Sequence, residues 1–175
     1  IAKQLQIPLE IVMSKKIGHP INKEYAIGAV TLESRILSEF VPGISKRYIA
    51  NETSRIRKVL KERYKTYYGK TAPLSLRDKN VIIVDDGVAT GNTLISSIQL
   101  IRKQKPLSIV VAFPLAPKTA LKKIKELKSV VATICLLTPY NFHAVGQFYE
   151  EFNQVNDQEV IQLLKDANTN LVPNL

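Results

Sequence analysis

The fold is decided by one stretch, Val81-Ile82-Ile83-Val84-Asp85-Asp86-Gly87-Val88-Ala89-Thr90-Gly91-Asn92-Thr93. Four consecutive apolar residues are typical of a strand buried on both faces of a parallel sheet. Two adjacent carboxylates, a loop of small and hydroxyl residues, and the start of a helix follow at once. Because ligands of open parallel sheets bind beyond the carboxyl ends of the strands, this stretch predicts a ligand site.

Each part of the loop suits an anion. Backbone N–H groups and a helix N-terminus hold phosphates, and Gly87 and Gly91 would let the backbone approach one closely. The hydroxyl and amide side chains of Thr90, Asn92 and Thr93 add donors. The carboxylate pair, Asp85 and Asp86, would accept hydrogen bonds from sugar hydroxyls or bind Mg²⁺ that bridges to phosphate oxygens.

A structural interpretation competes for the same residues. Asp86-Gly87 on its own is an ordinary turn that closes a strand, and Thr93 on its own is an ordinary helix cap. Other nucleotide-binding loops do not fit, because the stretch has no G-x-G-x-x-G pattern and lacks the lysine of a Walker A loop. The thirteen residues together favour the phosphate site.

The rest of the chain alternates strands and helices. Ile1–Gln6 is interpreted as the last turns of a helix. Apolar runs predict strands over residues 9–14, 26–32, 81–84, 108–113 and 130–137. Periods near 3.6 predict helices over residues 54–68 (ended by Gly69), 93–104 and 118–128, and a capping box at Asn156 predicts a last helix. Such alternation predicts an α/β fold, with an open, mostly parallel sheet, helices on both faces and right-handed crossovers. We expect a single domain over residues 1–175.

Composition narrows the classes of partner. The chain has 175 residues, of which 45% are hydrophobic and 23% charged, so a disordered or fibrous chain is excluded. Lys and Arg number 25 against 15 Asp and Glu, a net charge of +10, which favours an anionic partner. The charge allows a phosphorylated small molecule, a nucleic acid or a membrane surface, of which we do not expect the membrane. No apolar stretch reaches the ~20 residues that span a bilayer. Cys135 is the single cysteine, which fits a reducing, cytoplasmic location. It lies in an apolar run, which favours a buried core thiol over a reactive one.

Residues 81–93 match at every position the signature of the type I phosphoribosyltransferases, and most of the chain resembles one branch of that family. The branch is labelled predicted phosphoribosyltransferase, and its acceptor is unassigned. Further shared features are Lys16-Ile17-Gly18 with Glu24, then residues 26–29, residues 111–117, residues 142–149 and Phe152.

The resemblance implies a function in nucleotide metabolism. Phosphoribosyl diphosphate would bind with Mg²⁺, and a small nitrogenous acceptor, nucleobase-like, would displace its diphosphate. Asp85 and Asp86 would be the catalytic pair, contacting the ribose hydroxyls directly or through Mg²⁺. The 5′-phosphate would lie on Val88, Ala89, Thr90, Gly91, Asn92 and Thr93. Lys16 is a candidate for contact with the diphosphate, with a solvated strand end as the alternative.

Two departures from the family pattern matter. Position 89 is Ala, where 6-oxopurine enzymes of the family carry an acidic residue, so a hypoxanthine or guanine acceptor is disfavoured. The family's diphosphate loop follows a first strand that precedes the helix ending near Gln6. We therefore expect a further strand and this loop upstream of residue 1.

The stretch 46–70 supports a rival interpretation. It has nine basic residues against two acidic ones, with tyrosines interleaved, which is a pattern of single-strand nucleic-acid binders. Its basic residues could also contact the diphosphate or simply form a solvated helix face. The rival protein is a regulator of the same fold that senses phosphoribosyl diphosphate or a nucleotide and binds RNA or DNA. His143, after Phe142, would lie over the acceptor base or serve a structural role. The sequence leaves open whether the chain forms a homo-oligomer.

Overall fold

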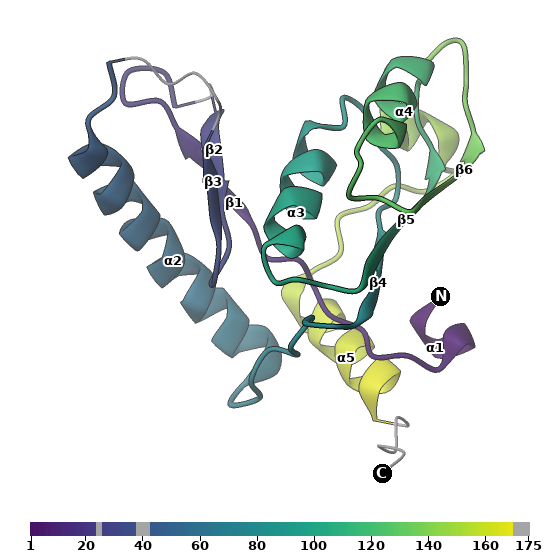
Figure 1. Cartoon of the computed structure of the whole chain (residues 1–175). Coiled ribbons are helices and arrows are strands. Elements are labelled where there is room, and N and C mark those ends of the chain that lie inside the picture. Colours follow the sequence, from purple (N-terminus) through teal and green to yellow (C-terminus); the bar gives the residue numbers. More distant parts are fainter. Residues whose placement is uncertain (24–25, 38–42, 170–175) are drawn as a thin grey trace. The chain divides into compact units, whose positions relative to one another are not determined.

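The computed structural model describes residues 1–23, 26–37 and 43–169 (Figure 1). Described residues of Ile1–Glu33, Phe40–Leu74 and Asn153–Leu175 form one compact unit. Those of Ser34–Glu39 and Ser75–Phe152 form a second unit. Whether the chain is a single domain stays a prediction. Among the described residues, no helix is long and apolar enough to cross a membrane.

The second unit contains the parallel sheet. Its strands are β4 (Asn80–Val84), β5 (Ser108–Leu115) and β6 (Ala132–Leu137), in that order, with Ile83 opposite Val111 and Phe113 opposite Cys135. The connections are α3 (Asn92–Arg102) and α4 (Lys118–Lys125), and Figure 1 shows them beside the sheet. The α/β fold with a parallel sheet flanked by helices is thereby confirmed. A short strand, β3 (Arg35–Leu37), and a 3₁₀ turn, η1 (Val145–Phe148), were not predicted.

One face of this sheet makes the core of the second unit. Ile83, Val111 and Phe113 pack against Ile98 of α3 and Ile124 of α4, and all five are buried. Each such side chain contributes roughly 1.5–3 kcal/mol on burial. Cys135 packs against this core cluster, but it is only partly buried rather than buried as predicted.

The prediction that residues 81–84 are buried on both faces is also wrong. Val84 is 50% exposed and Ile82 37% exposed, while Ile83 between them is buried. Ile98 of α3 and Ile124 of α4 belong to the buried cluster on the face of Ile83, so both helices pack on that face and leave the other exposed. A run of four apolar residues carries no information on which face the helices cover.

The first unit pairs a hairpin with long helices. Its elements are α1 (Ala2–Leu5), β1 (Lys15–Gly18), β2 (Ala26–Val30), α2 (Lys46–Tyr68) and α5 (Asp157–Asn168). The strands β1 and β2 are antiparallel, and Ile17 and Val30 from them are buried with Ile56 and Leu60 of α2. The capping residue predicted for α5 is confirmed, because the Asn156 side chain accepts from the Glu159 N–H.

The helix α2 begins at Lys46, eight residues before the predicted start at Ser54. Ser45 caps it, because its hydroxyl oxygen accepts from the Tyr48 N–H at 3.2 Å. Gly69 ends the helix, as predicted. The 3.6-residue period puts Val59 on the same face as Ile56 and Leu60, yet it is 39% exposed.

Residues 9–14, predicted as a strand, form none; the strand starts at Lys15. Side chains satisfy the backbone there. Asn168 accepts from the Leu9 N–H at 2.9 Å and donates to the Leu9 carbonyl at 3.0 Å, and the Tyr68 hydroxyl accepts from the Ile11 N–H. Backbone groups bonded to side chains 57 and 159 residues away have no need of a neighbouring strand.

Candidate functional site

The acidic pair and the loop after it are held against the neighbouring strand. The Asp85 N–H donates to the Ala112 carbonyl at 3.3 Å, one residue past the end of β4. Three residues later, the Val88 N–H donates to the Leu115 carbonyl at 2.9 Å. Both anchors lie on β5, so the loop leaves the carboxyl edge of the sheet in one defined path before α3 begins.

A pocket of about 260 Å³ opens at this edge. Most of the predicted site residues line it together. The lining residues are Asp85, Gly87, Val88, Ala89, Thr90, Gly91, Thr93, Leu94 and Val145. Asp86 and Asn92 flank the pocket without lining it, and Leu94 and Val145 were not predicted. The stretch 85–94 therefore lines one pocket at the edge of the sheet, in which Ala89, Thr90 and Thr93 are exposed.

The N-terminus of α3 is open toward an anion. Gly91 is its N-cap, with φ +82°, and contributes no side-chain hydrogen bond. The Thr90 hydroxyl lies 3.5 Å from the Asn92 nitrogen, the outer limit of a hydrogen bond. The first turn of a helix has N–H groups without intrahelical partners and a partial positive charge. These are the donors that a phosphate in the pocket would meet.

The two carboxylates differ in environment. Asp85 is half-buried and Asp86 is exposed, and the Asp85 carboxylate accepts from the Asp86 N–H at 3.1 Å. Burial, and then the negative charge of Asp86, raise the pKa of Asp85 above its usual value. A bound cation would relieve that cost.

Asp85 and Asp86 fit a Mg²⁺ ion that takes its remaining ligands from substrate and water. Three or more potential metal ligands gather nowhere in the described parts of the chain. Mg²⁺ commonly uses one or two carboxylates plus substrate phosphates and waters, and Asp85 with Asp86 can supply that share.

Gly87 serves a packing role that the sequence did not reveal. A Cβ there would lie 2.7 Å from Val145 Cγ1 and 3.2 Å from Leu115 Cδ1. Gly87 therefore allows a close approach to η1, and its approach to a phosphate, since it also lines the pocket, stays a prediction. At Gly91, by contrast, a Cβ would meet nothing nearer than Ile95 Cδ1 at 3.6 Å, and only the positive φ requires glycine.

We expect Gly87→Ala to destabilise the chain by about 1–3 kcal/mol, the usual cost of overpacking. Denaturant unfolding measures this loss. In the double variant with Val145→Ala the clashing methyl groups are gone, so the loss should be smaller than the sum of the two single losses. Additive losses would show that Gly87 is required for another reason.

The segment after β6 folds back onto the acidic pair. The Tyr149 hydroxyl donates to the Asp86 carbonyl at 2.5 Å. The Gln147 side chain shapes the segment, accepting from the His143 N–H and donating to the Asn141 carbonyl, each at 2.8 Å. Sequence reasoning missed Tyr149 and Gln147 as site residues, although both lie in the stretch 142–149 that carries the resemblance.

We expect Tyr149→Phe to cost about 1 kcal/mol of stability, the net value of one hydrogen bond. Because the bond holds the Asp86 peptide, affinity for ribose 5-phosphate should also fall a few-fold, which calorimetry measures. Tyr140→Phe is the matched control, since Tyr140 is 90% exposed and its hydroxyl accepts from Lys118 at 3.4 Å. Equal effects of the two variants would contradict a role for Tyr149 at the acidic pair.

Lys16 lies on β1 in the first unit, with an exposed side chain, and its contact with a diphosphate stays a prediction. The basic stretch 46–70 lies mainly on α2, in the same unit. His143 is exposed in the second unit, and its role also stays a prediction.

Comparison with known proteins identifies the family. The family model described as "Phosphoribosyl transferase domain" matches residues 1–152. Two proteins from strains of Mycobacterium tuberculosis, each named "Putative phosphoribosyl transferase", are 33% identical over 171 residues, 95% of this chain. The chain spans only 38% of the length of these curated relatives.

Two further proteins are similar. A "Uracil phosphoribosyltransferase" from Mycoplasma genitalium is 35% identical over 60 residues, 34% of this chain and 29% of that protein. The crystal structure of TT1426 from Thermus thermophilus superposes with a TM-score of 0.80 at 30% identity. This match covers 94% of the present chain and 79% of that one, so the likeness extends through nearly the whole fold.

Proposed function

The chain belongs to the phosphoribosyl transferase domain family, and from this premise we propose that it binds 5-phosphoribosyl 1-diphosphate with Mg²⁺ and transfers the phosphoribosyl group to a nitrogenous acceptor. One observation carries the proposal. The half-buried Asp85 and the N-terminus of α3, which has no side-chain cap, line the same 260 Å³ pocket. That arrangement offers sugar-hydroxyl acceptors and phosphate donors side by side.

In this proposal, different groups of the chain bind the phosphate and the ribose of the substrate. The 5′-phosphate meets the backbone N–H groups of the first turn of α3 and the hydroxyls of Thr90 and Thr93. The ribose hydroxyls donate to Asp85 and Asp86, whose peptide Tyr149 holds. Mg²⁺, held by this pair when bound, would neutralise negative charge on the departing diphosphate.

In the proposed reaction, the bond from the anomeric carbon to the diphosphate oxygen breaks and its electron pair leaves with diphosphate. The acceptor nitrogen supplies the pair for the new bond and gives up its proton to solvent. Positive charge develops on the ribose between these events. Asp85 and Asp86, near the ribose, stabilise that charge electrostatically.

The proposal specifies only the chemical class of the acceptor. Ala89 lines the pocket and has no group that could handle a purine proton. The similarity to a uracil phosphoribosyltransferase supports including pyrimidines among the candidates. The single cysteine favours a reducing compartment, so we place the activity in the cytoplasm.

The test is diphosphate release from phosphoribosyl diphosphate in the presence of Mg²⁺, screened over nucleobases and small amines. We expect release with at least one acceptor and none without Mg²⁺. Asp85→Asn is the matched variant, since it removes one charge at the same volume. Release that is independent of both the acceptor and Asp85 would contradict the assignment.

A regulator that senses the same ligand without turnover is the second candidate. The basic face of α2 favours it, because that face is not needed to build the pocket. Tight binding of phosphoribosyl diphosphate with no release over the whole screen would favour the regulator.

A further inference from the structure

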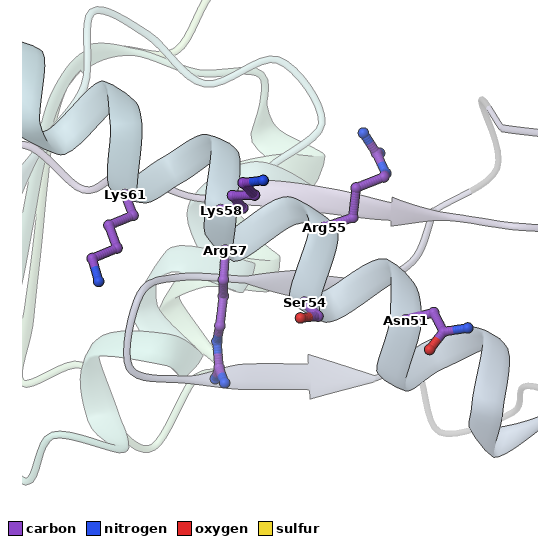
Figure 2. A pocket seen from close by; sticks show the side chains of 6 residues that line it. All are labelled: Asn51, Ser54, Arg55, Arg57, Lys58 and Lys61. Carbon is purple, nitrogen blue, oxygen red and sulfur yellow. The ribbon is translucent and has the colours of Figure 1, made fainter.

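The most basic helix of the first unit, α2, has a groove along its surface, shown in Figure 2. Its volume is about 570 Å³, and the lining residues are Asn51, Ser54, Arg55, Arg57, Lys58 and Lys61. We call it the α2 basic groove. No carboxylate from the described part of the chain lines it. Four cationic and two neutral polar side chains therefore face one hollow.

Carboxylates of the described residues neutralise only part of the positive charge of the groove. Lys58 and Lys61 are exposed, and neither has an ion-pair or hydrogen-bond partner among the described residues. Arg55 is neutralised by Glu52, to which it donates at 2.6 and 2.9 Å.

Arg57 is oriented by the backbone rather than by an acid. Its guanidinium donates to the carbonyls of Thr31 and Glu33, each at 3.4 Å, and no carboxylate of the described residues pairs with it. Figure 2 shows Arg57 and Lys61 extending from the same side of the helix. Three unneutralised cations, one of them pre-oriented, remain for an external anion.

The tyrosines of α2 are engaged elsewhere. The Tyr48 hydroxyl donates to the Gly18 carbonyl, Tyr67 is buried and donates to Asp157, and Tyr64 stacks on Tyr68 at 4.4 Å. None of them lines the groove. The basic residues and the tyrosines, which are interleaved in the sequence, therefore lie in different surroundings. The groove has no aromatic side chain on which a base could stack.

We propose that the α2 basic groove binds the phosphate backbone of a nucleic-acid duplex without reading its sequence. Residues three or four apart on a helix are separated by about 4.5–6 Å along its axis, so the cations form a row along the axis rather than a single cluster. A row of point charges without aromatic partners gains most from the polyanion of highest phosphate density. That is the duplex, with about one charge per 1.7 Å. The proposal goes beyond the transferase pocket, which lies in the other unit.

The experiment uses the whole chain and a fluorescent DNA duplex of about two helical turns (~20 base pairs), followed by anisotropy over a series of salt concentrations. Three phosphates neutralised give a slope of about −3 in log affinity against log salt. A single strand of the same length should bind more weakly. Saturating ribose 5-phosphate should not release the duplex.

The test variant is Lys58→Gln with Lys61→Gln. We expect its affinity at low salt to fall at least about tenfold and its salt slope to lose about two units, one for each phosphate contact. The matched control is Lys123→Gln with Lys125→Gln, which removes the same charge from exposed positions on α4. Circular dichroism confirms that both variants are folded.

Several results would overturn the proposal. Equal losses in the two variants would mean that net charge alone attracts the duplex. Preferred binding of the single strand would mean that bases, not phosphates, are recognised. Release of the duplex by ribose 5-phosphate would place the nucleic acid at the pocket of the second unit instead.

Discussion

Replacing both Asp85 and Asp86 with Asn will weaken the Mg²⁺-dependent binding of phosphoribosyl diphosphate by at least about tenfold, because hydrogen bonds to charged groups contribute roughly 1.5–3 kcal/mol each. Asn keeps the volume of Asp and an oxygen to accept the backbone N–H of residue 86, so the loop should keep its path. Calorimetry with and without Mg²⁺ measures the change. Affinity that is unchanged in Mg²⁺ would remove the acidic pair from the site.

The same variant should not lose stability at neutral pH. The pKa of Asp85 is raised in the folded chain, mainly by burial, so the folded state binds this proton more tightly than the unfolded state. The favourable contribution of this proton to the stability of the folded state is complete below the unfolded pKa of 3.8. It disappears as the pH rises through the higher pKa of the folded state. Asn avoids that loss. Urea unfolding should therefore show equal or greater stability at neutral pH, and a clear destabilisation there would point to an unrecognised partner of the carboxylates.

Gly91→Val will abolish measurable binding of ribose 5-phosphate and of 5′-mononucleotides. Its φ of +82° is in a region that β-branched residues rarely adopt, and holding such a residue there costs about 1–3 kcal/mol. Steric conflict with the protein is not the cause, because a Cβ would meet Ile95, Val88 and Ala120 at ordinary distances of 3.6–3.9 Å. The chain should relieve the strain by rotating the backbone at Gly91, which moves the N–H donors of α3 away from the phosphate.

Gly69→Val is the matched control for this prediction. Gly69 also has a positive φ, +63°, with nothing within 4 Å of an added Cβ, and it lies in the first unit. Its substitution should cost a similar amount of stability and leave ligand affinity unchanged. If the two variants bind ribose 5-phosphate equally well, the 5′-phosphate is held elsewhere.

The contiguous parts of the site could be predicted from the sequence. Residues 85–93 are neighbours along the chain, so one strand end, one loop and one helix start bring them together in any parallel sheet of this kind. Helix periods and the cap at Asn156 are likewise properties of short segments. The resemblance of residues 81–93 to a known signature added the ligand class, which local patterns alone left open.

Contacts between distant segments could not be predicted. Residues 9–14 have the composition of a strand, but Asn168 and Tyr68 satisfy their backbone. One face of β4 is exposed because α3 and α4 both pack on the other face, which no run of apolar residues records. The hydroxyl that holds Asp86 comes from Tyr149, 63 residues away.

The sequence by itself therefore determined the elements, the acidic pair and the phosphate loop, because hydrogen bonding and burial period act between residues a few positions apart. The tertiary structure alone decided that Val145 packs against Gly87 and lines the pocket, and that the tyrosines of α2 lie away from its basic groove. Both depend on which surfaces meet when separate segments pack. Which surfaces meet depends on the shapes and the burial of all segments in a unit, so no single segment determines it.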